Sequence, residues 1–370
     1  TAMKITLHTR MQDFGQMVDG ITIELDQIAP ALQPEDFRCT DCFYDIGASK
    51  PISGVKSVKA EGNALHLETD SFLYRTDFAV ECVSPRLPVK IDKGSADKVE
   101  LFHEKMFRPI MENGVRYRLY EPERTGPRPL ILFLHGGGGS GEDNLLQLTD
   151  TVGAIKLAER LPDMYIMAPQ APAGGLSMDE MLARMMAKGD PYKVIVGSDP
   201  DNDKDDRGWN REYLGRVCDL IRAMIADGRV DAHRVYVIGM SMGGFGTIKA
   251  VSIAPDLFAA CAPICPSMNG ESYPILENFP DVPAYISSAY IDHQAGRHAY
   301  MLRAVQKLWD KGRRNIRYTL FTPEELEAYG IGITPGLSMK ELYMENHNSW
   351  ILVMHNEYGI LDWMLSHRKP

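Results

Sequence analysis

The sequence predicts an α/β protein, in which a mostly parallel sheet flanked by helices follows a small β-sandwich. After about residue 114, short apolar stretches alternate with long amphipathic helical patterns, which is typical of a parallel sheet covered on both faces. Before residue 110, short alternating stretches recur between turn residues without a helical pattern, as in small antiparallel sandwiches. The segment 239–243 adds a tight turn between a strand and a helix, because Gly-x-Ser-x-Gly joins them directly.

These patterns divide the chain into a region at 1–110 and a larger one at 111–370. In the first region, strands are expected at 4–8, 21–25, 64–68 and 78–82. In the second, strands are expected at 115–120, 130–134, 164–168, 235–239, 284–288 and 316–321, and helices at 212–226, 243–252, 300–311 and 357–366. The segment 174–208 is long for a crossover loop, so we expect it to form a cap or rim above the sheet.

The composition excludes several classes of protein. The chain has 370 residues, 44% of them hydrophobic and 24% charged, so it can bury a large core in two domains. Its net charge of −10 argues against a nucleic-acid surface, which needs clustered Lys and Arg. No apolar run approaches the roughly 18 residues of a membrane span. We therefore expect a soluble protein, cytoplasmic or secreted after signal removal, with a homo-oligomer left open.

The six cysteines do not indicate a disulfide scaffold in a chain of this length. Cys218, Cys261 and Cys265 lie in apolar stretches and are expected to be small core residues. Cys39 and Cys42 form a Cys-x-x-Cys pair, but no second pair follows at zinc-ribbon spacing and no βαβ pattern surrounds it. We therefore expect strand-end cysteines here, with a metal or redox role as the alternative.

The segment 201–212, DNDKDDRGWNRE, resembles a calcium-binding loop. Oxygen-bearing side chains stand at alternate positions, and Glu212 occupies the twelfth. Asp206 stands at the sixth position, where such loops need Gly for their turn. The sequence therefore predicts a solvated acidic loop without a metal, with calcium binding as the alternative.

The strongest chemical signal is Ser241 in the segment 234–246, RVYVIGMSMGGFG. The turn must push the Ser hydroxyl out above the sheet, so the positions two before and two after it must lack bulk. Ser241 then lies at a helix N-terminus, where free N–H groups favour developing negative charge. We expect Ser241 to be a nucleophile and the Met242 amide to point at the oxyanion, the alternative being a plain strand–turn–helix.

Upstream, the segment 135–139, HGGGG, ends a buried strand. Glycines at this place let the backbone approach a ligand, and an N–H from such a loop commonly completes an oxyanion hole. We expect Gly137 to be the donor and His135 to brace the loop. A flexible turn is one alternative, and a phosphate-binding loop is disfavoured because no P-loop Lys-Ser/Thr follows.

A nucleophile of this kind needs an acid and a base that follow it in the chain. Asp292 comes just after an apolar strand, at the sheet edge where ligands collect, and is the expected acid. His347 lies in a loop after the last strand and is the expected base. The rivals are Asp281 and Glu324 for the acid, and His355 and His293 for the base; a helix N-cap is the other alternative for Asp292.

With these residues assembled, 110–370 resembles the α/β-hydrolase carboxylesterases of the "predicted peptidase" group, relatives of feruloyl esterases and polyhydroxybutyrate depolymerases. The matching pieces follow the family's order: 134–144 (LHGGGGSGEDN), 168–170 (APQ), 234–246, 263–265 (PIC) and 347–350 (HNSW). The acid region departs from the family's pattern, because SSAYIDHQ at 287–294 replaces a strand ending in His-Gly.

The resemblance implies an α/β-hydrolase fold with Ser241, Asp292 and His347 as nucleophile, acid and base, and with Met242 and the His-Gly loop as oxyanion donors. It also implies that 1–110 is an immunoglobulin-like domain. We therefore expect a serine carboxylesterase that uses no cofactor and acts on a small-molecule or polymer-linked ester. The alternatives are a serine peptidase with the same triad and a non-catalytic binding protein on a hydrolase scaffold.

Overall fold

The computed structural model describes residues 3–45, 52–173, 208–268, 273–290, 292, 297–332 and 347–370. The chain divides into two units, Thr1–Met106 and Phe107–Pro370. Each unit has a sheet system and a core of its own. None of the helices in the described ranges has the length and apolar character that a membrane crossing requires.

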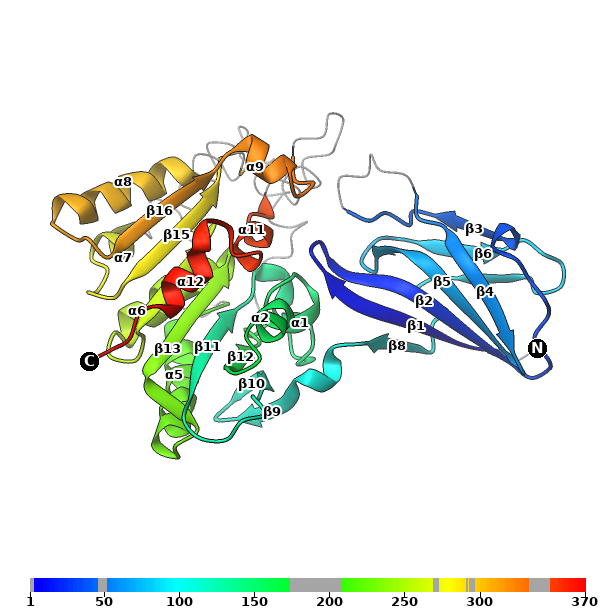
Figure 1. Cartoon of the computed structure of the whole chain (residues 1–370), viewed down its shortest axis with the longest axis horizontal. Helices are drawn as coiled ribbons and strands as arrows, with labels where there is room; N and C mark the ends of the chain where they lie inside the picture. The colour runs from blue at the N-terminus through cyan, green and yellow to red at the C-terminus, as the bar shows by residue number, and fades with distance from the viewer. Residues whose placement is uncertain are drawn as a thin grey trace. The chain divides into compact units, whose positions relative to one another are not determined.

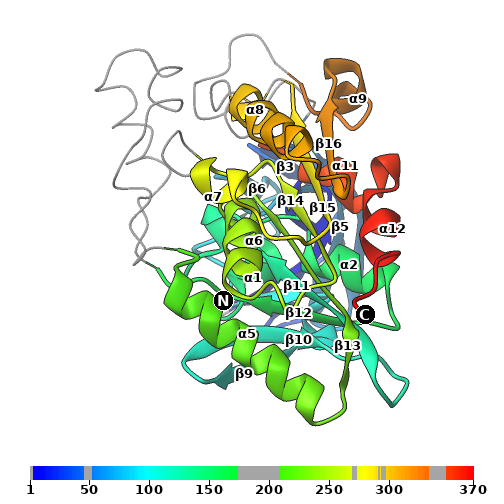
Figure 2. The ribbon, with the colours of Figure 1, turned by 90° about the vertical axis from the view of Figure 1, so that its left-hand side faces the viewer.

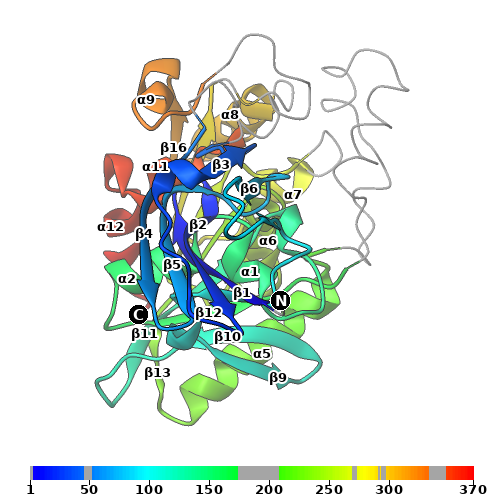
Figure 3. The ribbon, with the colours of Figure 1, turned by 90° about the vertical axis from the view of Figure 1, so that its right-hand side faces the viewer.

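The first unit contains a five-stranded and a three-stranded sheet (Figures 1 and 3). In spatial order, the larger sheet consists of β4 (Val55–Glu61), β5 (Ala64–Leu73), β2 (Gly15–Leu25), β1 (Met3–Gln12) and β8 (Lys98–Leu101). The smaller consists of β3 (Phe37–Thr40), β6 (Ala79–Cys82) and β7 (Val89–Ile91), and two short 3-10 helices, η1 (Pro34–Asp36) and η2 (Glu104–Met106), lie in the connections. All neighbouring strands are antiparallel except β1 and β8.

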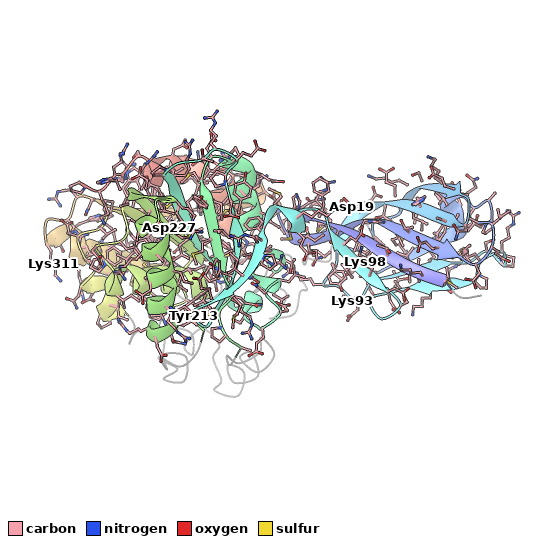
Figure 4. The ribbon with its side chains drawn as sticks, turned by 90° about the horizontal axis from the view of Figure 1, so that it is seen from below. Asp19, Lys93, Lys98, Tyr213, Asp227 and Lys311 are labelled. Atoms are coloured by element: carbon pink, nitrogen blue, oxygen red, sulfur yellow. The ribbon has the colours of Figure 1, made fainter. Side chains whose placement is uncertain are left out.

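The core of this unit consists of buried side chains that alternate with exposed ones along the strands. Ile5 on β1 and Ile21 on β2 are buried in the same apolar cluster as Val80 and Ile91 from the smaller sheet. On β5, the exposed residues His66, Glu68 and Asp70 alternate with buried ones. Asp19, labelled in Figure 4, lies at a bulge of β2 and pairs with Arg10 at 3.2 Å. Each sheet thus has an apolar face to bury, and the two faces share one core.

The second unit is built on an eight-stranded sheet in the order β16–β15–β14–β13–β11–β12–β10–β9. The strands are β9 (Arg108–Glu112), β10 (Val115–Tyr120), β11 (Arg128–Leu134), β12 (Tyr165–Pro169), β13 (Val230–Met240), β14 (Ala260–Ile264), β15 (Ala284–Ala289) and β16 (Ile316–Phe321). From β12 to β16 all pairs are parallel, whereas β10 runs antiparallel to both of its neighbours.

Helices cover both faces of this sheet (Figure 2). They are α1 (Leu146–Thr149), α2 (Ala154–Arg160), α5 (Arg211–Ala226), α6 (Met242–Ile253), α7 (Tyr273–Glu277), α8 (Arg297–Asp310), α9 (Pro323–Glu327), α11 (Trp350–Met354) and α12 (Ile360–Leu365), with 3-10 helices η3 (Gly137–Gly139) and η4 (Glu357–Gly359). On one face, Leu132 and Val237 share a core with α5, α6 and α8. On the other, Tyr236 donates to the Leu365 carbonyl of α12 at 3.2 Å. The sheet is therefore buried on both faces, as its continuous apolar strands predict.

The predicted strands of the second region are confirmed, but β9 and β14 were not anticipated. β14 has only five residues and contains Pro263, so it lacks a clear strand signal. The predicted helix at 357–366 is broken, because Tyr358 within η4 has a φ of 55° and Gly359, which precedes α12, has a φ of 61°. The expected cap at 174–208 lies outside the described residues except for Gly208.

Candidate active site

Ser241 lies in a strained turn between β13 and α6. Its φ of 56° and ψ of −118° are rare for a residue with a side chain, so the turn stores strain of about 1–3 kcal/mol. A Cβ added to Gly239 would lie 2.3 Å from the Gly243 carbonyl oxygen, and one on Gly243 would lie 1.9 Å from that of Leu134. Both positions therefore require glycine, which is the physical content of the Gly-x-Ser-x-Gly pattern.

The structure brings Ser241, His347 and Asp292 together. His347 Nε2 lies 2.8 Å from Ser241 Oγ, and His347 Nδ1 lies 2.8 Å from Asp292 Oδ2. His347 and Asp292 are 3% and 5% exposed, whereas Ser241 is half-buried. Because Asp292 accepts from Nδ1–H, Nε2 is left free to accept the Ser241 proton. The buried pair can thus direct a base at an accessible hydroxyl.

The carboxyl end of the sheet positions both partners of the serine. Asp292 follows β15, and its amide donates to the Ala289 carbonyl at 3.2 Å. His347 precedes α11, and its ring meets that of Trp350 edge-on, with the centroids 5.4 Å apart. The carboxyl ends of parallel strands meet at one edge, so residues far apart in sequence converge there.

The rival residues lie in other surroundings. The Asp281 side chain is 87% exposed, precedes β15 and pairs with Arg313 at 3.3 Å. Glu324 is exposed in the first turn of α9, and His355 caps the C-terminal end of α11. His293 lies outside the described residues.

The glycine loop borders the serine. A Cβ added to Gly136 would lie 3.7 Å from Ser241 Cβ, so the loop backbone passes directly beside Ser241. Gly137 begins η3, and Met242 begins α6. The first amides of a helix have no acceptor within it, so Met242 N–H is available to an anion beside Ser241.

His135 is buried within this loop, as a bracing residue should be. Burial lowers its pKa to about 4, so the ring is neutral at pH 7. Nε2 accepts a hydrogen bond of 2.9 Å from the Ala171 amide, and Nδ1 then donates to the Gly136 carbonyl. A Cβ added to Gly139 would lie 2.5 Å from His135 Nδ1, so a side chain there would displace the imidazole.

Gln170 ties the far side of the glycine loop to the sheet, a role that the sequence did not reveal. Its Nε2 donates to the Gly139 carbonyl at 3.1 Å and to Asp143 Oδ1 at 2.7 Å, and its Oε1 accepts from the Asn144 amide at 2.7 Å. The hydroxyl of Tyr213, labelled on α5 in Figure 4, donates to the Gln170 carbonyl at 2.5 Å. The motif 168–170 was the only signal for this residue.

Trp209 is a second residue that sequence reasoning missed. It is 1% exposed, and its Nε1 donates to the His135 carbonyl at 3.0 Å. A Cβ on Gly246 would lie 2.8 Å from Trp209 Cγ, so the indole is wedged between the glycine loop and α6. Its place within the acidic segment 201–212 concealed this packing role.

Cys265 adjoins the histidine and the aspartate. Its Sγ lies 3.8 Å from the His347 carbonyl oxygen, and its sulfur, a carboxylate oxygen of Asp292 and a ring nitrogen of His347 lie within 4.8 Å of one another. In the described part of the chain, this is the one cluster with donors spaced for a metal ion. Its imidazole and carboxylate are already hydrogen-bonded to each other.

The calcium-like segment is described only in part, since 201–207 lies outside the described residues. Glu212, its twelfth position, belongs to the first turn of α5. Its side chain is 87% exposed and lies 3.9 Å from Arg216 Nη2. This carboxylate thus serves a helix-surface ion pair.

The chain is similar to a known protein family and to solved structures. The profile of the prolyl oligopeptidase family matches residues 207–302, which include Ser241 and Asp292. No curated protein matches the chain. Among solved structures, a thermostable esterase is 22% identical with a TM-score of 0.64, covering 99% of this chain and 100% of that one. An arylesterase is 12% identical with a TM-score of 0.44, covering 70% of this chain and 85% of that one.

The strand order, the strained serine turn and the likeness to the thermostable esterase define an α/β-hydrolase fold. The prolyl oligopeptidase match, which spans the turn, supports a serine hydrolase of this fold.

Proposed function

We propose that the protein is a carboxylesterase in which Ser241, His347 and Asp292 form the catalytic triad. The observation that carries the proposal is the 2.8 Å contact between Ser241 Oγ and His347 Nε2, made on a strained turn at the carboxyl edge of the sheet. A strained turn that exposes one hydroxyl to one imidazole is costly, and such strain concentrates where chemistry needs it.

In the proposed reaction, His347 Nε2 takes the Ser241 proton while Oγ attacks the ester carbonyl carbon. The tetrahedral intermediate collapses, and His347 returns the proton to the departing alcohol. Water then attacks the acyl-enzyme by the same route in reverse and releases the acid. Asp292 holds Nδ1–H and stabilises the imidazolium, so no cofactor is required.

The oxyanion of each intermediate lies, in this proposal, between the amides of Met242 and Gly137. The first amide lies at the N-terminus of α6, where the helix dipole favours negative charge. The second belongs to the loop braced by His135 and Gln170. One such donor is typically worth a factor of about 10²–10³ in kcat.

The substrate is proposed to be a small-molecule or polymer-linked ester. The test is a panel of p-nitrophenyl and aryl esters of increasing acyl length, measured beside a matched peptide panel, with Ser241→Ala as the control. The proposal requires that the wild type hydrolyses esters and that Ser241→Ala does not. Turnover of neither panel, or ester hydrolysis that survives in Ser241→Ala, would overturn it.

A serine peptidase is the second candidate, and the prolyl oligopeptidase match is what favours it. The same triad could cleave amides, which are harder substrates because their leaving group must be protonated. A higher kcat/KM on the peptide panel than on the ester panel would decide for the peptidase.

We further propose that the first unit, which ends at Met106, is the immunoglobulin-like domain expected at 1–110 and supplies no catalytic group. The two sheets around one core support a sandwich, and every group of the proposed reaction lies between Gly137 and His347. A fluorophosphonate probe tests whether the scaffold is active at all. Failure to label Ser241 would favour a binding protein on a hydrolase scaffold.

A further inference from the structure

Two cysteines lie at the end of β3 in the smaller sheet of the first unit. Cys39 is half-buried on the strand, and Cys42 is fully buried just beyond it. Between them the chain turns back at Asp41, whose φ of 52° lies in the left-handed region. The turn places Cys42 Sγ 3.4 Å from the carbonyl oxygen of Thr40 and 3.7 Å from that of Ala79. Cys42 is therefore folded back over the end of the strand that carries Cys39.

The two thiols affect each other's pKa unequally. The neighbouring Cys42 thiol lowers the pKa of Cys39, while the Cys39 thiol, together with burial, raises the pKa of Cys42. Burial raises the pKa of Cys82, Cys218 and Cys261 as well. The structure thus pairs a half-exposed thiol, whose pKa is lowered, with a fully buried thiol, whose pKa is raised.

We propose that Cys39 and Cys42 are a reversible dithiol–disulfide pair that is oxidised by low-molecular-weight disulfides such as oxidised glutathione. The turn at Asp41 folds Cys42 back over the end of the strand that carries Cys39, as the short ring closed by a Cys-x-x-Cys disulfide requires.

The exchange proceeds in two steps that balance. The Cys39 thiolate attacks one sulfur of the small disulfide, whose S–S bond breaks and releases one thiol after protonation. Cys42 then loses its proton and attacks the Cys39 sulfur of the mixed disulfide, which releases the second thiol. One small disulfide is reduced as two protein thiols are oxidised. Cys39 reacts first in this scheme, because it is half-buried whereas Cys42 is fully buried.

The bond would close a turn that already links the two sheets. The Cys42 carbonyl accepts from the Ser53 amide at 2.8 Å, and the next carbonyl, that of Phe43, accepts from Leu73 at the end of β5 at 2.8 Å. Oxidation should therefore raise the thermal stability of the first unit modestly, since the loop that it closes is short. The proposal is independent of the reaction at Ser241.

The test uses the full chain, reduced and then equilibrated without oxygen in reduced and oxidised glutathione mixtures. Free thiols are blocked with an alkylating reagent, and the peptides are mapped by mass spectrometry. We expect one Cys39–Cys42 disulfide that forms and breaks as the ratio of reduced to oxidised glutathione changes. The matched control Cys82→Ser, in the same sheet, should keep this disulfide.

The decisive measurement is the asymmetry of the trapped intermediate. Cys42→Ser should accumulate glutathione on Cys39, because the resolving thiol is gone, whereas Cys39→Ser should leave Cys42 unmodified. If a variant loses the wild-type circular dichroism, alkylation rates of the wild-type chain replace it, and Cys39 should react faster than Cys42. Absence of the disulfide under full oxidation, equal alkylation rates, or glutathione on Cys42 in preference to Cys39 would overturn the proposal.

Discussion

Replacing Asp292 by Asn tests the proposed triad most sharply, because it changes one charge and almost no volume. Asp292 is 5% exposed, and its Oδ2 accepts from His347 Nδ1 at 2.8 Å. An amide at that place can donate to Nδ1, which moves the ring proton to Nε2, where it faces Ser241 and prevents that nitrogen from acting as a base. A wrong tautomer of this kind costs about 10⁴ in kcat, or about 5 kcal/mol of transition-state stabilisation.

The assay is the steady-state hydrolysis of a soluble p-nitrophenyl ester by the wild type and two variants. For Asp292→Asn, kcat should fall about 10⁴-fold, while KM changes little because Asp292 does not touch the substrate. The matched control is Asp281→Asn, the same change on a side chain that is 87% exposed. Its surface ion pair is worth at most about 1 kcal/mol of stability, and its kcat should stay near that of the wild type.

Two results would refute this reasoning. If Asp292→Asn kept more than about a tenth of the wild-type kcat with an unchanged melting temperature, the carboxylate would not control the tautomer. If Asp281→Asn or Glu324→Gln caused the large loss instead, the acid would have to be reassigned.

The remaining predictions concern the proposed nucleophile and base, the turn at Ser241, His135 in the glycine loop, and the first unit. Ser241→Ala should lower kcat by about 10⁴–10⁶ and abolish fluorophosphonate labelling. In steady-state kinetics, the kcat of His347→Ala should fall to a similar level, and that of the double variant should be scarcely lower. Gly243→Ala should disrupt the turn at Ser241 or prevent soluble expression, because the added Cβ would lie 1.9 Å from a backbone carbonyl oxygen. Circular dichroism of the variant measures this loss of structure. The free energy of unfolding should fall as the pH drops from about 6.5 towards 4, because unfolding lets His135, whose folded pKa is lowered to about 4, take up a proton. Denaturant titrations should show that His135→Asn flattens this dependence. A chain of 107–370 alone should still be labelled by fluorophosphonate, though with lower stability.

The serine turn could be predicted from the sequence because its constraints are local. Gly239 and Gly243 are required by contacts below 2.5 Å around a backbone that one short pattern describes. Asp292 and His347 could be proposed because chain order and the shared edge of parallel strands limit the candidates. Their mutual contact spans 55 residues of sequence and depends on the strand order, which only the structure supplies.

The support of the glycine loop was not predictable in the same way. Trp209 contacts the His135 carbonyl across 74 residues of sequence, and Gln170 reaches Gly139 across 31. Neither contact leaves a periodic or spaced pattern, since an indole or an amide buried by tertiary packing looks like any other in the sequence. The acidic run before Trp209 even favoured a solvated loop.

The end of β14, a strand that the sequence did not predict, and the residue just after it contact both Ser241 and His347. Ile264 accepts from the Ser241 amide at 3.0 Å, and the Ser241 carbonyl accepts from Ser267 at 2.9 Å, so the strained residue is held by hydrogen bonds on both sides of its Cα. The next residue after the strand, Cys265, lies against the His347 carbonyl. One short segment therefore holds Ser241 on both sides and contacts the backbone of His347, the residue that faces it. Strain of about 1–3 kcal/mol persists only where the surroundings impose it, and here part of that constraint comes from the same segment that contacts His347.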